Sequence, residues 1–147
     1  MEKIWETHTE AETRALAEQL ARQAQPGDIF CLSGDLGVGK TVFAQGFARG
    51  LAIPDSEYIA SPTFAIVNVY EEGRLPLYHF DVYRIGDADE MEDTGYEQYF
   101  FGQGVCLVEW AALIAELIPP TAQWITIEKD LSRGTDYRKI TLRGGNL

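Results

Sequence analysis

The chain has 147 residues, of which 46% are hydrophobic, and its formal net charge at pH 7 is −11. A chain of this length suits one domain, residues 1–147, which buries about 70% of the surface that its unfolded form exposes. Because affinity for a nucleic-acid backbone depends on clustered lysine and arginine, the acidity argues against a chain that grips nucleic acid unaided.

The apolar segments of the chain are all short. None has the length of a membrane span, and the N-terminus has neither the basic patch nor the apolar run of a signal peptide. Cys31 and Cys106 lie in apolar runs without metal-ligand spacing, so we expect two reduced, buried thiols. We therefore expect a soluble, cytoplasmic protein that makes no membrane contact. Its acidity fits simple solubility and docking on a basic partner equally well.

The first predicted element is a helix. Thr9 and Glu12 have the spacing of a capping box, which opens a helix that reaches about residue 24. The residues expected on its inner face are Ala15, Leu16, Leu20 and Ala24.

A glycine-rich loop follows, between an apolar strand predicted at residues 28–33 and a helix predicted at residues 41–51. Its sequence, Gly34-Asp35-Leu36-Gly37-Val38-Gly39-Lys40-Thr41, fits the phosphate-binding pattern G-x-x-x-x-G-K-[ST]. In such a loop the backbone N–H groups surround the phosphates, Lys40 reaches the terminal phosphates and the Thr41 hydroxyl ligates Mg²⁺. The sequence therefore predicts a nucleotide site rather than a plain turn with a solvated Lys40. Its expected binding residues are Leu36, Gly37, Val38, Gly39, Lys40 and Thr41.

The rest of the chain predicts further strands and short helices. In chain order they are strands at 64–70 and 75–80, short helices at 87–91 and 96–101, a strand at 105–108, a helix at 111–118 and strands at 124–128 and 137–142. The first two strands form a hairpin. This alternation around a phosphate loop predicts an α/β fold, a three-layer, P-loop NTPase-like sheet of mixed parallel and antiparallel strands with flanking helices.

Two carboxylates compete to complete the predicted site. Glu109 ends an apolar run typical of a strand buried on both faces, whereas Asp81 ends a strand that contains Pro76, which suggests a sheet edge. Since ligands in such folds lie beyond the carboxyl ends of the central strands, we favour Glu109 for the metal over a salt-bridged carboxylate. Asp81 then either positions or deprotonates the attacking water, or caps the turn at residues 82–84.

Other polar residues are less decisive. Ser61 and Thr63 precede a predicted strand and fit a switch segment that responds to the terminal phosphate, or an ordinary turn. Arg133 is a candidate positive charge for the nucleotide. His79 and Trp110 are interpreted as packed residues.

Four motifs in this order closely resemble the bacterial TsaE family, also called YjeE. They are Gly34 to Thr41, Ser61-Pro62-Thr63-Phe64, His79-Phe80-Asp81-Val82-Tyr83-Arg84 and Leu107-Val108-Glu109-Trp110. The resemblance runs from about residue 9 to residue 133. Members of the family are small ATPases required for threonylcarbamoyladenosine (t6A) modification of tRNA, and they work with the partner proteins TsaD and TsaB.

The resemblance implies roles for individual residues. ATP and Mg²⁺ are the implied cofactors, with Lys40 on the phosphates and Asp81 in the hydrolytic step. Thr41 and Glu109 would hold Mg²⁺, and Ser61 to Phe64 would form the switch. The positions similar to those that line the base and ribose side of the nucleotide are Glu10 and Arg133.

The sequence thus leads to a hypothesis with two alternatives. The hypothesis is that the protein is an ATPase that hydrolyses ATP slowly alone and is stimulated by its partners. It would drive cycling of the TsaD–TsaB complex and contact tRNA only indirectly. The alternatives are a nucleotide-gated binding module without essential hydrolysis and a small-molecule kinase. A GTPase is disfavoured because no Asn-Lys-x-Asp motif occurs.

Overall fold

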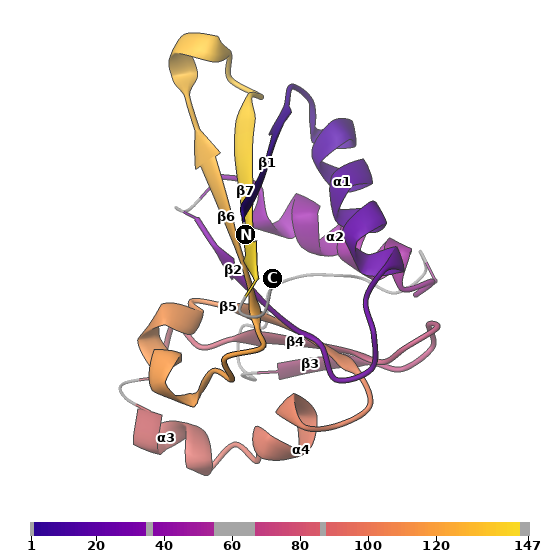
Figure 1. Ribbon diagram of the computed structural model, residues 1–147, viewed down its shortest axis with the longest axis vertical. Helices are drawn as coiled ribbons and strands as arrows, with labels where there is room; N and C mark the ends of the chain where they lie inside the picture. The colour runs from indigo at the N-terminus through magenta and orange to yellow at the C-terminus, as the bar shows by residue number, and fades with distance from the viewer. Residues whose placement is uncertain (1, 35–36, 55–66, 86–87, 145–147) are drawn as a thin grey trace.

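The computed structural model describes residues 2–34, 37–54, 67–85 and 88–144. These residues form one seven-stranded sheet with helices on both faces (Figure 1). The elements are β1 (Glu2–Thr7), α1 (Glu10–Arg22), β2 (Ile29–Ser33), α2 (Lys40–Gly50), β3 (Val67–Tyr70), β4 (Leu77–Asp81), α3 (Ala88–Glu92), α4 (Glu97–Phe100), β5 (Val105–Glu109), η1 (Ala111–Leu117), β6 (Gln123–Lys129), η2 (Leu131–Arg133) and β7 (Arg138–Gly144).

The strand order is β1-β7-β6-β2-β5-β4-β3. The central strands β6, β2, β5 and β4 are parallel, while β3 pairs antiparallel with β4, and β7 pairs antiparallel with both β6 and β1. The predicted mixed α/β fold is confirmed, including the β3–β4 hairpin. Of the two closing strands, β7 is antiparallel as expected, whereas β6 runs parallel to β2. Because the parallel strands end at one edge of the sheet, the segments that follow β2, β4, β5 and β6 meet there.

Two apolar cores fill the space between the layers. Phe43 and Phe47 of α2 pack with α1 and one face of the sheet, and Phe80 and Phe100 pack with η1 on the other face. In Figure 1, α1 and α2 lie side by side, apart from α3 and α4. Cys31 and Cys106 are free and buried as expected, and burial raises the pKa of each thiol to about 12. No helix in the described ranges is long and apolar enough to cross a bilayer.

Helix α1 begins as its capping box predicts, because the Thr9 hydroxyl accepts a hydrogen bond from the Glu12 amide at 3.1 Å. Its expected inner face needs one correction, since Ala15 is exposed. The buried stripe of the helix instead consists of Thr13, Leu16, Ala17 and Ala21. This stripe follows the 3.6-residue helical period, from which Ala15 deviates.

Two features of the sheet differ from the sequence analysis. Strand β1 was not predicted. It is mostly exposed, and it pairs with β7 and packs Trp5 on the core. The edge position suggested for the strand that ends at Asp81 is wrong, because β4 lies between β5 and β3. Pro76 does not interrupt the sheet, since it precedes β4 and its carbonyl accepts a hydrogen bond from Val105 N.

The helix predicted after β5 is present in a tighter form. Residues Ala111–Leu117 form a 3₁₀ helix that is irregular at Ile114, whose side chain is fully buried. Ile118 then adopts an extended conformation, which is what a residue before proline favours. The segment still covers the second face of the sheet, as the apolar pattern required.

Candidate functional site

The phosphate-binding loop joins β2 to α2 at the carboxyl edge of the sheet. Gly37 and Gly39 have φ angles of +76° and +106°, a left-handed region that residues with side chains rarely adopt. A Cβ atom on Gly34 would lie 2.8 Å from the carbonyl oxygen of Ile127 in β6. The glycines are therefore required by the backbone path. They bring the free N–H groups of the first turn of α2, which begins at Lys40, to the end of β2.

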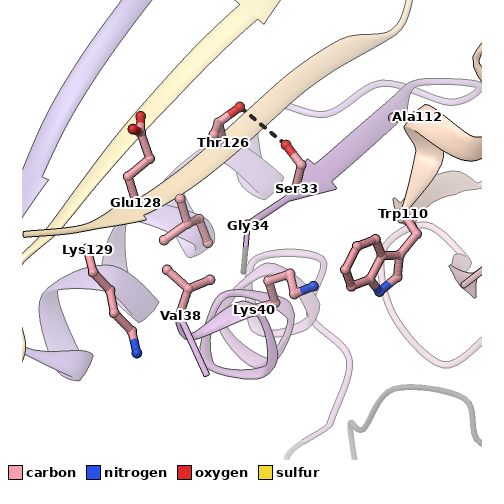
Figure 2. A pocket seen from close by; sticks show the side chains of 10 residues that line it. Ser33, Gly34, Val38, Lys40, Trp110, Ala112, Thr126, Glu128 and Lys129 are labelled. Atoms are coloured by element: carbon pink, nitrogen blue, oxygen red, sulfur yellow. Dashed lines mark hydrogen bonds between the residues drawn. The ribbon is translucent and has the colours of Figure 1, made fainter. Parts of the chain in front are cut away.

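A cleft of about 730 Å³ opens beside this loop (Figure 2). Its lining residues come from the ends of β2, β5 and β6 and from the loop: Ser33, Gly34, Val38, Lys40, Trp110, Ala112, Thr126, Ile127, Glu128 and Lys129. Ser33 and Thr126, on neighbouring strands, lie 3.3 Å apart through their hydroxyl oxygens. The cleft thus lies where the parallel strands end, which is where α/β sheets bind ligands.

Buried polar side chains in contact with one another lie behind the cleft. Lys40 is only 8% exposed, and its Nζ lies 3.9 Å from Oε1 of Glu109, the last residue of β5. The other oxygen of Glu109, Oε2, lies 2.6 Å from Nε2 of His79. The structure therefore brings Lys40 and Glu109 together, and it shows the salt-bridged carboxylate that was the alternative to a metal-binding role for Glu109. It adds His79, which the sequence analysis interpreted only as packed.

Asp81 lies beside Glu109 in the sheet register, on β4. It is half-buried, and its Oδ1 accepts a hydrogen bond from Tyr83 N at 3.0 Å. Asp81 therefore caps the turn at residues 82–84, which was one of its two expected roles. Loss of water around the carboxylate raises the pKa of Asp81 above its ordinary value, and the charge of Glu109 adds to this effect. A carboxyl group with a raised pKa is a stronger base once ionised.

Trp110 follows Glu109 and connects the cleft to the turn after β4. It has φ +64°, a conformation that is costly for a bulky residue and that often marks a functional segment. Its ring centroid lies 4.3 Å from Lys40 Nζ and 4.8 Å from the Tyr83 ring. Figure 2 shows the Lys40 amine pointing toward the indole. Trp110 is a packing residue, as interpreted, but its packing partner is the lysine of the loop.

The other predicted binding residues lie around the loop. Thr41 is exposed in the first turn of α2. Glu10, at the start of α1, lines a hollow of about 80 Å³ together with Gly37 and Gly39. Arg133 lines a separate hollow of about 430 Å³, which shares Glu128 and Lys129 with the main cleft. The remaining predicted site residues, Leu36, Ser61 and Thr63, lie outside the described residues.

Two basic residues near the loop were missed by the sequence analysis. Arg138 of β7 donates from Nε to the Val38 carbonyl at 2.6 Å, and from Nη1 to the carbonyls of Thr135 and Tyr137 at 2.9 and 2.7 Å. Lys129 Nζ lies 3.6 Å from where a Cβ on Gly37 would stand. Both approach the loop because β6 lies next to β2 in the sheet and β7 lies next to β6, and no local sequence pattern marks them.

The donor set suits a magnesium ion that arrives with a nucleotide. In the described part of the chain, no three His, Cys, Asp or Glu side chains gather closely enough to hold a metal by themselves. Mg²⁺ at phosphate sites commonly takes one or two protein oxygens and completes its shell with phosphate and water. Thr41 supplies a hydroxyl and Glu109 a carboxylate of that kind.

Comparisons with known proteins agree with the resemblance drawn from the motifs. The family model described as "Threonylcarbamoyl adenosine biosynthesis protein TsaE" matches residues 7–140. Among curated proteins, the "tRNA threonylcarbamoyladenosine biosynthesis protein TsaE" of Bacillus subtilis is 51% identical over 137 residues, which are 93% of this chain and 82% of that protein. The protein of the same name from Treponema pallidum is 42% identical over 68% of this chain and 72% of its own length.

A solved structure shares the fold. The crystal structure of Bacillus subtilis YdiB superposes with a TM-score of 0.79 at 44% sequence identity, over 98% of this chain and 86% of that one. The family match covers most of the chain, from β1 to β7, and includes the phosphate loop, Asp81 and Glu109. The chain therefore belongs to the TsaE family, whose members are named for the biosynthesis of threonylcarbamoyladenosine in tRNA.

Proposed function

We propose that this chain is an ATPase of tRNA t6A biosynthesis that binds MgATP at residues 34–41 and hydrolyses it slowly by itself. One observation carries the proposal. The loop presents free backbone N–H groups at the end of β2, and Lys40 stands there beside the buried carboxylate of Glu109. A cation and a carboxylate at this edge match the needs of a phosphate chain and its metal ion.

Each side chain has a distinct task in this proposal. Lys40 neutralises the charge of the terminal phosphates, and the loop amides orient them. Thr41 and Glu109 provide the protein oxygens for the Mg²⁺ that accompanies ATP. Asp81 accepts a proton from the attacking water or orients that water, and its raised pKa favours the basic role. Phosphoryl transfer needs mainly positioning and charge neutralisation, so these few groups suffice for slow turnover.

The proposed partners are the proteins TsaD and TsaB, and the protein acts in the cytoplasm. ATP binding and hydrolysis drive repeated cycles of their complex, and tRNA is met through that complex, in keeping with the net charge of −11. Positive charge supplied by a partner can raise phosphoryl-transfer rates by several orders of magnitude. Stimulation by the complex is therefore part of the proposal.

The test is steady-state ATP hydrolysis by the purified chain, with and without TsaD and TsaB. Lys40→Ala serves as the control for contaminating ATPases, because it removes the phosphate-binding cation. We expect hydrolysis that the partners stimulate and that Lys40→Ala abolishes. Hydrolysis at the same rate in Lys40→Ala shows that the measured activity does not come from this site. Tight MgATP binding with no stimulation at saturating partner contradicts the coupling.

A second function is favoured by the hydrogen bond from Tyr83 N to Asp81, which ties this carboxylate to its own turn. In that case the chain is a nucleotide-gated binding module, and its hydrolysis is incidental. Asp81→Ala separates the two functions. If ATP binding survives and tRNA modification continues over many turnovers, hydrolysis is dispensable and the module is correct. If modification stops after one turnover, the ATPase is correct.

A further inference from the structure

We propose that His79 is a positioning residue that holds the Glu109 carboxylate in the orientation needed for Mg²⁺. This inference rests on the proposed MgATP function, which it extends from the cleft into the sheet behind it. His79 lies in the middle of β4, and its nearest residue in the β5 register is Leu107, two positions before Glu109. It is completely buried, so it acts on the site only through Glu109.

The burial of polar groups in this protein is concentrated at this point. The buried polar or charged side chains in the described residues are Thr7, Thr13, Lys40, His79 and Glu109. Three of these five contact one another in series, because Glu109 lies between Lys40 and His79. Buried polar groups weaken a fold unless they are hydrogen-bonded, and here the bonds converge on a single carboxylate.

The two ring nitrogens of His79 differ sharply. Nε2 lies 2.6 Å from Glu109 Oε2, whereas Nδ1 is buried and has no hydrogen-bond partner among the residues that the structure describes. A carboxylate only accepts, so Nε2 carries the proton and donates, and Nδ1 holds a lone pair. The opposite tautomer would bury an N–H group with no acceptor and would set a lone pair against a carboxylate. The tautomer with the proton on Nε2 is therefore the one that fits this site.

An imidazole is not needed here for packing alone. On the same strand, Leu77 and Phe80 are fully buried and apolar. An apolar side chain at position 79 would fill the core without leaving an orphan nitrogen. What the imidazole adds is a fixed donor for one oxygen of Glu109. With Oε2 held in this way, Oε1 faces Lys40, which lines the cleft.

Partners of this kind orient metal-binding carboxylates in many proteins, and their loss commonly lowers metal affinity by about 10- to 100-fold. The same range is expected here for the Mg²⁺ requirement. A proton-transfer role for His79 is excluded by geometry, because the ring is fully buried and its free nitrogen has no described partner to pass a proton to.

The first experiment determines, without any nucleotide, which ring nitrogen of His79 carries the proton. The chain contains only two histidines, so the ring nitrogens of His8 and His79 are readily separated by ¹⁵N NMR of the full chain. We expect His79 to carry its proton on Nε2, with slow exchange of that proton, and Glu109→Ala to abolish the slow exchange. A proton on Nδ1, or a spectrum unchanged by Glu109→Ala, overturns the proposal.

The second experiment compares His79→Gln with His79→Leu. The Nε2 of glutamine can donate to Glu109 much as the imidazole does, whereas leucine cannot donate at all. We titrate Mg²⁺ at fixed ATP, measuring nucleotide binding by calorimetry and hydrolysis in parallel. His79→Leu is expected to need about 10- to 100-fold more Mg²⁺, while His79→Gln stays near the wild type. ATP affinity in EDTA should be the same in all three proteins.

Thr7→Val is the matched control, because it breaks another buried hydrogen bond, between the hydroxyl groups of Thr7 and Thr13, away from Glu109. It should leave the Mg²⁺ requirement unchanged. In a Glu109→Gln background, His79→Leu should add no further loss. If the wild type binds ATP without any Mg²⁺ dependence, the proposed function fails and this role fails with it. If the wild type binds ATP in a Mg²⁺-dependent way and His79→Leu has the same Mg²⁺ requirement, the proposed function stands and only the positioning role of His79 is wrong.

Discussion

Two small clusters on the carboxyl side of the sheet have nearly the same chemistry but very different surroundings. Each joins a cation, a carboxylate and a ring, namely Lys40, Glu109 and His79 in the buried cluster and Arg133, Glu6 and Tyr137 in the outer cluster. The side chains of Lys40 and Glu109 are 9% and 3% exposed, whereas those of Arg133 and Glu6 are 55% and 48% exposed. Water screens the outer charges and leaves the inner ones dependent on each other. Burial, more than bond length, should therefore decide which cluster matters to the fold.

The largest effect is expected from Glu109→Ala. This change leaves the Lys40 ammonium buried without its counter-charge and the His79 ring buried without its hydrogen-bond partner. Breaking a buried pair from one side costs about 3–5 kcal/mol, so we expect a loss of about that size in the free energy of unfolding. Urea denaturation of the variant and the wild type measures it. A loss below about 1 kcal/mol would show that this cluster behaves like a surface pair.

The next largest effect is expected from Arg138→Met, which detaches β7 from the phosphate loop. Arg138 donates to three backbone carbonyls, including that of Val38 in the loop. Hydrogen bonds to charged groups contribute about 1.5–3 kcal/mol, so we expect about 2 kcal/mol less stability. Under the proposed function, MgATP affinity falls about tenfold because the loop is less well ordered.

Arg143→Met is the matched control for Arg138, since it lies on the same strand. Arg143 pairs with Glu2 at 2.6 Å, but its side chain is 73% exposed. Removing it should change neither stability nor MgATP affinity measurably. Equal effects of the two substitutions would contradict the idea that Arg138 acts through its carbonyl contacts.

The contrast between the clusters also shows what the sequence can predict. The phosphate loop is a local pattern, in which eight consecutive residues carry their own backbone requirements, and its position between β2 and α2 was predicted. The apolar run before Glu109 likewise predicted a buried strand, and all of β5 is buried. Both predictions depend on neighbours in the chain.

The roles of His79 and Arg138 depend instead on contacts between distant segments. His79 meets Glu109 because β4 lies beside β5, and Arg138 reaches Val38 across 100 residues of sequence. A lone histidine or arginine in a strand gives no local sign of such a contact. The mistaken edge position of β4 has the same origin, because a proline near a strand end does not specify which strands flank it.

A smaller effect is expected from Glu6→Gln in the outer cluster. Glu6 accepts hydrogen bonds from both Arg133 and the Tyr137 hydroxyl, at 2.5 and 2.8 Å. Glutamine keeps an acceptor but loses the charge, which water already screens. We expect a decrease in stability that is barely measurable at low salt and absent in 1 M NaCl. A decrease that persists at high salt would show that the hydrogen bonds, rather than the charge, stabilise the outer cluster.

The smallest expected effect, Asp81→Asn, has the opposite sign. Desolvation raises the folded-state pKa of Asp81 above its ordinary value of 3.8, so the folded protein favours the protonated carboxyl group. The stability from this group is present in full below the unfolded-state pKa and is lost as pH rises through the folded-state pKa. At pH 7, asparagine removes that penalty, and its oxygen can still accept from Tyr83 N. The variant should therefore be slightly more stable than the wild type in urea at pH 7, and the difference should disappear below about pH 3.8. A less stable variant at pH 7 would show that the ionised carboxylate is favoured at this site, as in the buried cluster next to it.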